Sequence, residues 1–144
     1  MSDDASIIQD IAHIEHFLIE NYDVYVSMEK DGLDEYWFDP EDPSDPGVVS
    51  ISTANDLETQ LFVLLHEAGH VMLRRHTGDF PKYFPDSSRT TQNGRLEILK
   101  EEVAAWLKAQ ELAEDLGIEL NAARWRANYR LALLKYVEWV PTGD

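Results

Sequence analysis

The chain contains 144 residues, with a formal net charge of −16 and no cysteine. A chain of this length forms one ordinary domain with a hydrophobic core of its own. Without cysteine there are neither disulfides nor thiolate metal sites, and an acidic surface repels phosphate backbones, so we expect no nucleic-acid partner.

The acidic residues are unevenly distributed along the chain. Residues 1–60 contain 16 acidic residues and one basic residue, whereas residues 61–144 contain 12 acidic and 11 basic residues. We interpret this charge as a solvated surface, with a preference for basic partners or DNA mimicry as the alternative. No apolar run is long enough to span a membrane, and the first ten residues lack the basic region of a signal peptide. We therefore expect a cytoplasmic protein without a membrane partner.

The first part of the chain predicts one helix followed by three strands. The spacing of apolar residues indicates an amphipathic helix over residues 6–20. Stretches rich in aromatic and β-branched residues then predict three strands, at 22–28, 35–38 and 47–52. A loop rich in proline and aspartate, residues 39–47, separates the second strand from the third.

The remainder predicts three helices. The first covers residues 57–75 and is capped by one of three side chains, Thr53, Asn55 or Asp56. A long polar loop at 78–94 precedes helices over 95–116 and 121–139. This order predicts an α+β fold with a small antiparallel sheet beside helices. We expect a single domain over residues 1–144, with residues 1–5 and 141–144 as loose ends.

The helix at 57–75 carries the sequence His66-Glu67-Ala68-Gly69-His70 among mostly apolar residues. Residues four apart lie on one face of a helix, so two imidazoles at this spacing can bind one Zn²⁺ from the same side. A carboxylate one residue after the first histidine can take a proton from a water that the metal activates. We therefore predict His66 and His70 as zinc ligands and Glu67 as the catalytic base. The small Gly69 lets another element approach this face.

Three residues compete to be the third ligand. His76 has the spacing of the metzincins, but Leu73 occupies the position where that class needs glycine, so a continuing helix would turn His76 away. Glu102 has apolar neighbours at helical spacing, whereas the neighbours of Glu101 are charged and suggest a solvated face. A carboxylate on an apolar face needs a partner, and a dication would serve. We predict Glu102 as the third ligand.

The motif and its surroundings resemble the ImmA/IrrE-type metallopeptidases, which are gluzincin-like proteins common in phages and mobile elements. The resemblance covers residues 45–115 and rests on HEAGH after the apolar TQLFVLL, and on E-x-x-A beginning at Glu102. It implies a zincin-like fold with a zinc ion on His66, His70 and Glu102. It also implies limited hydrolysis of peptide bonds in a specific protein or peptide substrate, often a regulatory protein such as a repressor.

The chain departs from this family at two positions of the same helix. Lys108 replaces a usual aromatic residue, and Trp106 replaces a polar residue that often holds the first histidine. An indole cannot accept a hydrogen bond from an imidazole. This motivates an alternative function, a zinc-bound but non-catalytic acidic module that sequesters a protein partner.

Two further expectations concern the substrate. A peptidase site needs a donor for the negative charge that develops on the scissile carbonyl, and Tyr83, Tyr129 and His76 are candidates. The strand at 47–52 is expected to offer an open edge with which an extended substrate can pair.

Overall fold

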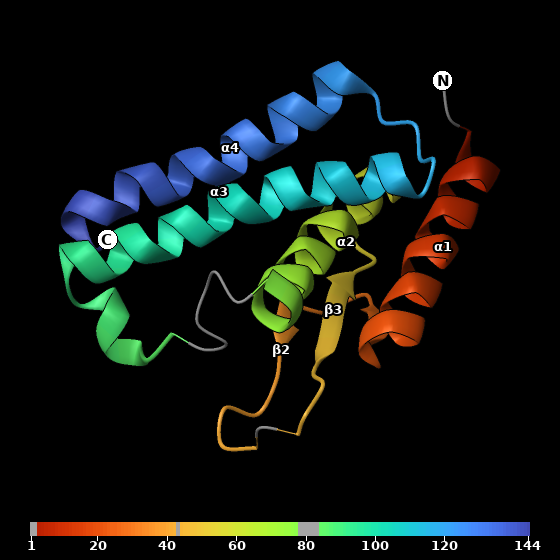
Figure 1. Cartoon of the computed structure of the whole chain (residues 1–144). Helices are drawn as coiled ribbons and strands as arrows, with labels where there is room; N and C mark the ends of the chain where they lie inside the picture. Colours follow the sequence, from red (N-terminus) through yellow and green to blue (C-terminus); the bar gives the residue numbers. More distant parts are fainter. Residues whose placement is uncertain (1–2, 43, 78–83) are drawn as a thin grey trace.

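The computed structural model describes residues 3–42, 44–77 and 84–144 (Figure 1). Helix α1 is followed by three strands and then by helices α2, α3 and α4, which confirms the predicted α+β class. Their bounds are α1 Asp4–Tyr22, β1 Tyr25–Glu29, β2 Glu35–Trp37, β3 Val48–Ser52, α2 Leu57–Met72, α3 Gln92–Asp115 and α4 Ala122–Thr142. A π-helical turn, η1 (Leu73–Thr77), continues α2, and a 3-10 turn, η2 (Asp86–Arg89), precedes α3.

The sheet is mixed rather than antiparallel. Its strand order is β1-β3-β2, with β3 parallel to β1 and antiparallel to β2. After β1 the chain turns back along β2, which does not pair with β1. The chain then continues through 39–47 into β3, which lies between β1 and β2. Because β3 pairs on both sides, the expectation of an open edge at residues 47–52 is wrong. Of the two edge strands, β1 and β2, it is β2 that lies on the side of the helices that follow the sheet.

Helix α2 lies at the centre of the molecule. One face packs on β2 and β3, another packs on α3, and α1 lies alongside, while α4 covers the far side of α3 (Figure 1). This position explains why α2 is apolar on nearly all sides. Its buried side chains share one core with Ile14 and Leu18 of α1 and with Val49 and Ile51 of β3. In the described part of the chain, no helix is long and apolar enough to cross a bilayer.

Helix α2 begins at a capped N-terminus and is followed by a shorter loop than expected. Of the three expected capping residues, Asp56 is the one that caps the helix, since its carboxylate accepts a hydrogen bond from the Thr59 backbone N–H at 2.8 Å. After α2 the expected long loop is shortened, because η2 and the first turn of α3 occupy part of 78–94. Residues 78–83 of that loop lie outside the described residues.

Helices α2 and α3 approach each other most closely at Gly69. A Cβ atom added to this glycine would collide with the carbonyl oxygen of Ala105 on α3. The expectation that Gly69 admits a neighbouring element is therefore confirmed. Ala105 lies about one helical turn beyond Glu102, so this contact also sets how near Glu102 comes to the histidines of α2.

We predict that Gly69→Ala lowers the free energy of unfolding. Helix propensity alone would stabilise α2 by about 1 kcal/mol, but overpacking against a backbone atom costs about 1–3 kcal/mol. Urea denaturation of the two proteins measures the difference. Adding Ala105→Gly should not restore stability, because the colliding atom belongs to the backbone. A gain in stability in Gly69→Ala would contradict the close contact.

Candidate metal centre

His66, His70 and Glu102 meet at one point between α2 and α3. The Nε2 atoms of the two histidines are 3.2 Å apart. The carboxylate oxygens of Glu102 lie 3.0 Å from Nε2 of His66 and 3.1 Å from Nε2 of His70. The two residues predicted on α2 and the one predicted on α3 are thus brought together.

The triangle formed by His66, His70 and Glu102 has the size that a zinc ion requires. Tetrahedral zinc with bonds of 2.0–2.1 Å separates its ligand atoms by about 3.3 Å, close to the observed distances. The three side chains are nearly buried, with 7–12% of their surface exposed. Two imidazoles and one carboxylate are a usual donor set for catalytic zinc, and they leave a fourth position for a reactant. The residues present therefore fit the ion.

Glu67 lies beside this triangle. Its Oε1 is 3.9 Å from Nε2 of His66, and the residue lines two cavities that also contain Glu102. Burial raises the pKa of Glu67, and the opposing effect of His70 and His66 only partly offsets it. The carboxylate is therefore placed to exchange a proton with a reactant at the triangle.

Glu101 is buried, so its expected solvated face is wrong. Its carboxylate accepts hydrogen bonds from Nε and Nη2 of Arg74, the latter at 2.9 Å, and its Oε1 lies 3.3 Å from Nδ1 of His70. The prediction for Glu101 considered only its neighbours along α3. Its counter-charge comes instead from Arg74, which belongs to η1. Burial would raise the pKa of Glu101, but the contacts with His70 and Arg74 hold it below its usual value.

The contact with Glu101 orients His70. A carboxylate that accepts the Nδ1–H of an imidazole fixes its tautomer and turns Nε2 toward a metal. Arg74 in turn holds the carboxylate with a two-pronged contact. The spacing of residues along one helix could not reveal this arrangement, because His70 comes from α2, Arg74 from η1 and Glu101 from α3.

His66 is held differently. Its ring stacks on the indole of Trp106, with ring centroids 4.1 Å apart and an interplanar angle of 22°. Within the described part of the chain, Nδ1 of His66 and Nε1 of Trp106 are the buried side-chain atoms without a hydrogen-bond partner. The departure at Trp106 therefore replaces a hydrogen bond by ring stacking.

The site as a whole is strongly anionic. Burial alone would lower the pKa of His70, but Glu102, Glu101 and Glu67 raise it to about 10. Conversely, burial would raise the pKa of Glu102, while His70 and His66 hold it well below its usual value. The centre of the triangle thus favours positive charge.

The sequence profile of a peptidase family, described as the IrrE N-terminal-like domain, matches residues 19–112. The chain belongs to this family. Its members are metallopeptidases, which agrees with the grouping of His66, His70 and Glu102. No curated protein and no solved structure is significantly similar to the chain. The match includes the three strands, α2 and most of α3, but it ends before α4.

Helix α4 nevertheless contributes a residue to the metallopeptidase site. Tyr136 lines the same cavities as Glu102, and burial together with the charge of that carboxylate raises the pKa of Tyr136. In the sequence, Tyr136 belongs to an aromatic stripe on the helix predicted at 121–139, a pattern that indicates core packing rather than a ligand site. No local pattern distinguishes it, because its position depends on how α4 packs along α3.

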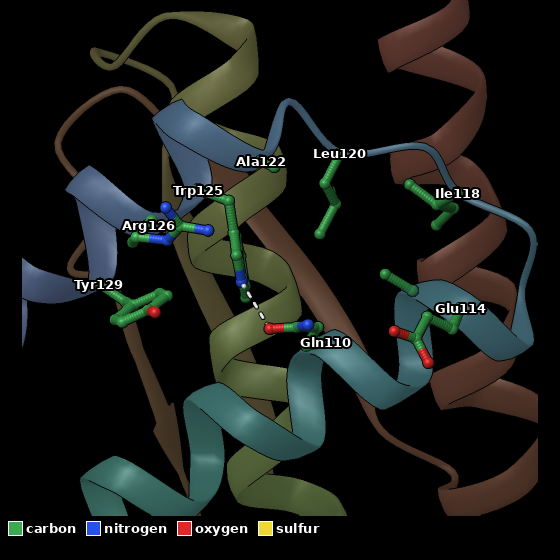
Figure 2. A pocket seen from close by; sticks show the side chains of 9 residues that line it. Gln110, Glu114, Ile118, Leu120, Ala122, Trp125, Arg126 and Tyr129 are labelled. Carbon is green, nitrogen blue, oxygen red and sulfur yellow. Dashed lines mark hydrogen bonds between the residues drawn. The ribbon is translucent and has the colours of Figure 1, made fainter.

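The three expected oxyanion donors have different outcomes. Tyr129 lines a separate cavity of about 320 Å³ between α3 and α4, where Nε1–H of Trp125 donates to Gln110 (Figure 2). It packs against Trp106 and Trp125 rather than at the triangle of His66, His70 and Glu102. Tyr83 lies outside the described residues. The backbone of His76 is part of η1, but its side chain is not among those that the structure describes. Its two predicted roles, as an oxyanion donor and as a third ligand, therefore stay predictions.

We predict that Glu102→Ala removes zinc from the purified protein. The wild type should carry about one zinc per chain when purified without added metal, because two imidazoles and the carboxylate together complete the site. Mass spectrometry of the native protein measures the content. The matched control is Glu97→Ala, which removes an exposed carboxylate of α3 that pairs with Lys100 at the surface. Full zinc content in Glu102→Ala would contradict the assignment.

We predict a smaller effect for Glu101→Gln. Loss of the carboxylate at Nδ1 of His70 should weaken zinc binding by about 10- to 100-fold without abolishing it. The thermal midpoint should also fall, because Arg74 loses its partner. Competition with a chelator of known affinity measures the change, with Glu97→Gln as the control. Zinc affinity equal to that of the wild type would show that Glu101 does not support His70.

Proposed function

We propose that the protein is a zinc-dependent peptidase that hydrolyses peptide bonds in a specific protein substrate. In this proposal His66, His70 and Glu102 hold the zinc ion and Glu67 is the general base. One observation carries it: the Nε2 atoms of His66 and His70 lie 3.2 Å apart, and each lies within 3.1 Å of a carboxylate oxygen of Glu102, beside a buried glutamate, in a chain of a metallopeptidase family. The finer points, zinc as the metal and a particular protein as substrate, rest on the donor set and on the family.

A bound zinc ion supplies Lewis-acid activation of a water molecule and of the scissile carbonyl. Glu67 accepts a proton from the attacking water as the water oxygen forms a bond to the carbonyl carbon. The same carboxyl group then passes that proton to the amide nitrogen as the C–N bond breaks. Glu101 and Arg74 keep His70 in place, and the Trp106 ring keeps His66 in place.

The cleft beside the triangle supports binding of an extended peptide. Strand β2 lines a cavity of about 500 Å³ together with Arg74, Glu102 and Tyr136. As an edge strand, β2 offers unpaired backbone groups to a substrate strand. A second cavity of about 400 Å³ has apolar walls from Val63, Trp106 and Leu131, which suit an apolar substrate side chain.

We predict that Glu67→Gln retains zinc but loses peptide cleavage. Removing the general base should lower the rate by at least about 100-fold, whereas the amide preserves the shape of the side chain. Mass spectrometry of a diverse peptide mixture before and after incubation detects cleavage, and chelation followed by added zinc tests its dependence on the metal. Undiminished cleavage in Glu67→Gln would end the general-base assignment.

The acidic first part of the chain favours a second candidate, a zinc-bound module that captures a basic protein without cleaving it. The same assay separates the two functions. If zinc-loaded wild type cuts no peptide in the mixture while Glu102→Ala still loses its metal, the site is a structural one and the interaction module is the better description.

A further inference from the structure

Tyr136 stands where the cavities around the triangle meet. It lines the 500 Å³ cavity beside β2, the 400 Å³ cavity that contains His66 and Glu67, and a third of about 240 Å³ that contains His70. Among the described residues, Glu102 is the other one that lines all three. Tyr136 is therefore reached by any group that approaches the triangle from these cavities.

We propose that Tyr136 is a catalytic residue of the proposed peptidase. Its phenolic O–H donates a hydrogen bond to the oxygen of the scissile carbonyl as negative charge develops on that oxygen. The inference deepens the proposed function and rests on it. It assigns the donor role to a helix that lies outside the family match, which ends at residue 112.

The cationic side chains in the three cavities are less suited to this task. Arg74 already donates to Glu101 through Nε and Nη2. Lys135 and Arg89 are solvent-exposed residues, and their positive charges would be repelled by a dication at the triangle. A phenol is a neutral donor, so it can stand beside a metal ion without that repulsion. Tyr136 already stands beside a member of the triangle, since it lines all three cavities together with Glu102.

A purely supporting role for Tyr136 makes a different prediction from a catalytic one. If the phenol only positioned Glu102, its removal would disturb metal binding in the free protein. If it stabilises the oxyanion, its removal leaves the free site unchanged and weakens interactions that form with a reactant. A donor of this kind contributes about 100- to 1,000-fold to the rate.

The test compares Tyr136→Phe with Tyr129→Phe, which removes a phenol from the same helix two turns away. Both proteins are loaded with cobalt(II), whose visible absorption reports the ligands, and titrated with acetohydroxamate, a probe that carries a carbonyl oxygen. We expect Tyr136→Phe to keep the metal content and cobalt spectrum of the wild type but to bind the probe about tenfold more weakly. With zinc, kcat for peptide cleavage should fall by about 100- to 1,000-fold with little change in KM. Tyr129→Phe should match the wild type in every measurement.

Each other outcome has a defined meaning. Equal probe affinity and equal kcat in Tyr136→Phe would overturn the inference, and so would an altered cobalt spectrum with weaker metal binding, which identifies a positioning residue. If the wild type binds cobalt and the probe but cleaves no peptide, the peptidase proposal fails, while weaker probe binding by Tyr136→Phe would still support the donor role. A wild type that binds neither metal would overturn both proposals.

Discussion

The close contact between α2 and α3 is the constraint on which the site depends. Because Gly69 has no side chain, the two backbones meet at Ala105, near the turn that carries Glu101 and Glu102. Successive residues of a helix point about 100° apart. Here those two directions lead to opposite nitrogens of one ring, since Glu101 lies at Nδ1 of His70 and Glu102 at Nε2. A wider separation of the helices would lose both contacts together.

This contact also removes several charges from water. Glu67, Glu101 and Glu102 are all nearly buried, and among the described residues Arg74 supplies a permanent positive charge in direct contact with Glu101. Burial of an ion costs several kcal/mol unless partners replace its hydration. Arg74 balances Glu101, which leaves the carboxylates on the other side of His70 in excess. The raised pKa of His70 is one expression of this excess, and a divalent cation at the triangle would be a more complete compensation.

The sequence predicted the parts of the site that depend on one helix at a time. The spacing of His66 and His70 and the apolar neighbours of Glu102 were sufficient, because helical periodicity determines which side chains share a face. The role of Glu101 was missed because its partner, Arg74, comes from another segment. Tyr136 was missed because its surroundings depend on the packing of α4. The parallel pairing of β1 with β3 was likewise missed, since strand order is a property of the whole chain rather than of any strand.

Trp106 connects α4, which lies beyond the family match, to the site formed by His66, His70 and Glu102. One face of its indole stacks on His66, and the ring also packs against Trp125 and Tyr129 of α4 at centroid distances of 5.2 and 6.2 Å. A small polar residue at this position could hold the imidazole by a hydrogen bond, but it would leave a gap beneath α4. The indole gives up that hydrogen bond and instead ties a ligand ring to the packing of α4. The helix that carries Tyr136 is thus positioned by the same aromatic group that supports a histidine of the triangle, so the two sides of the cleft are fixed relative to each other.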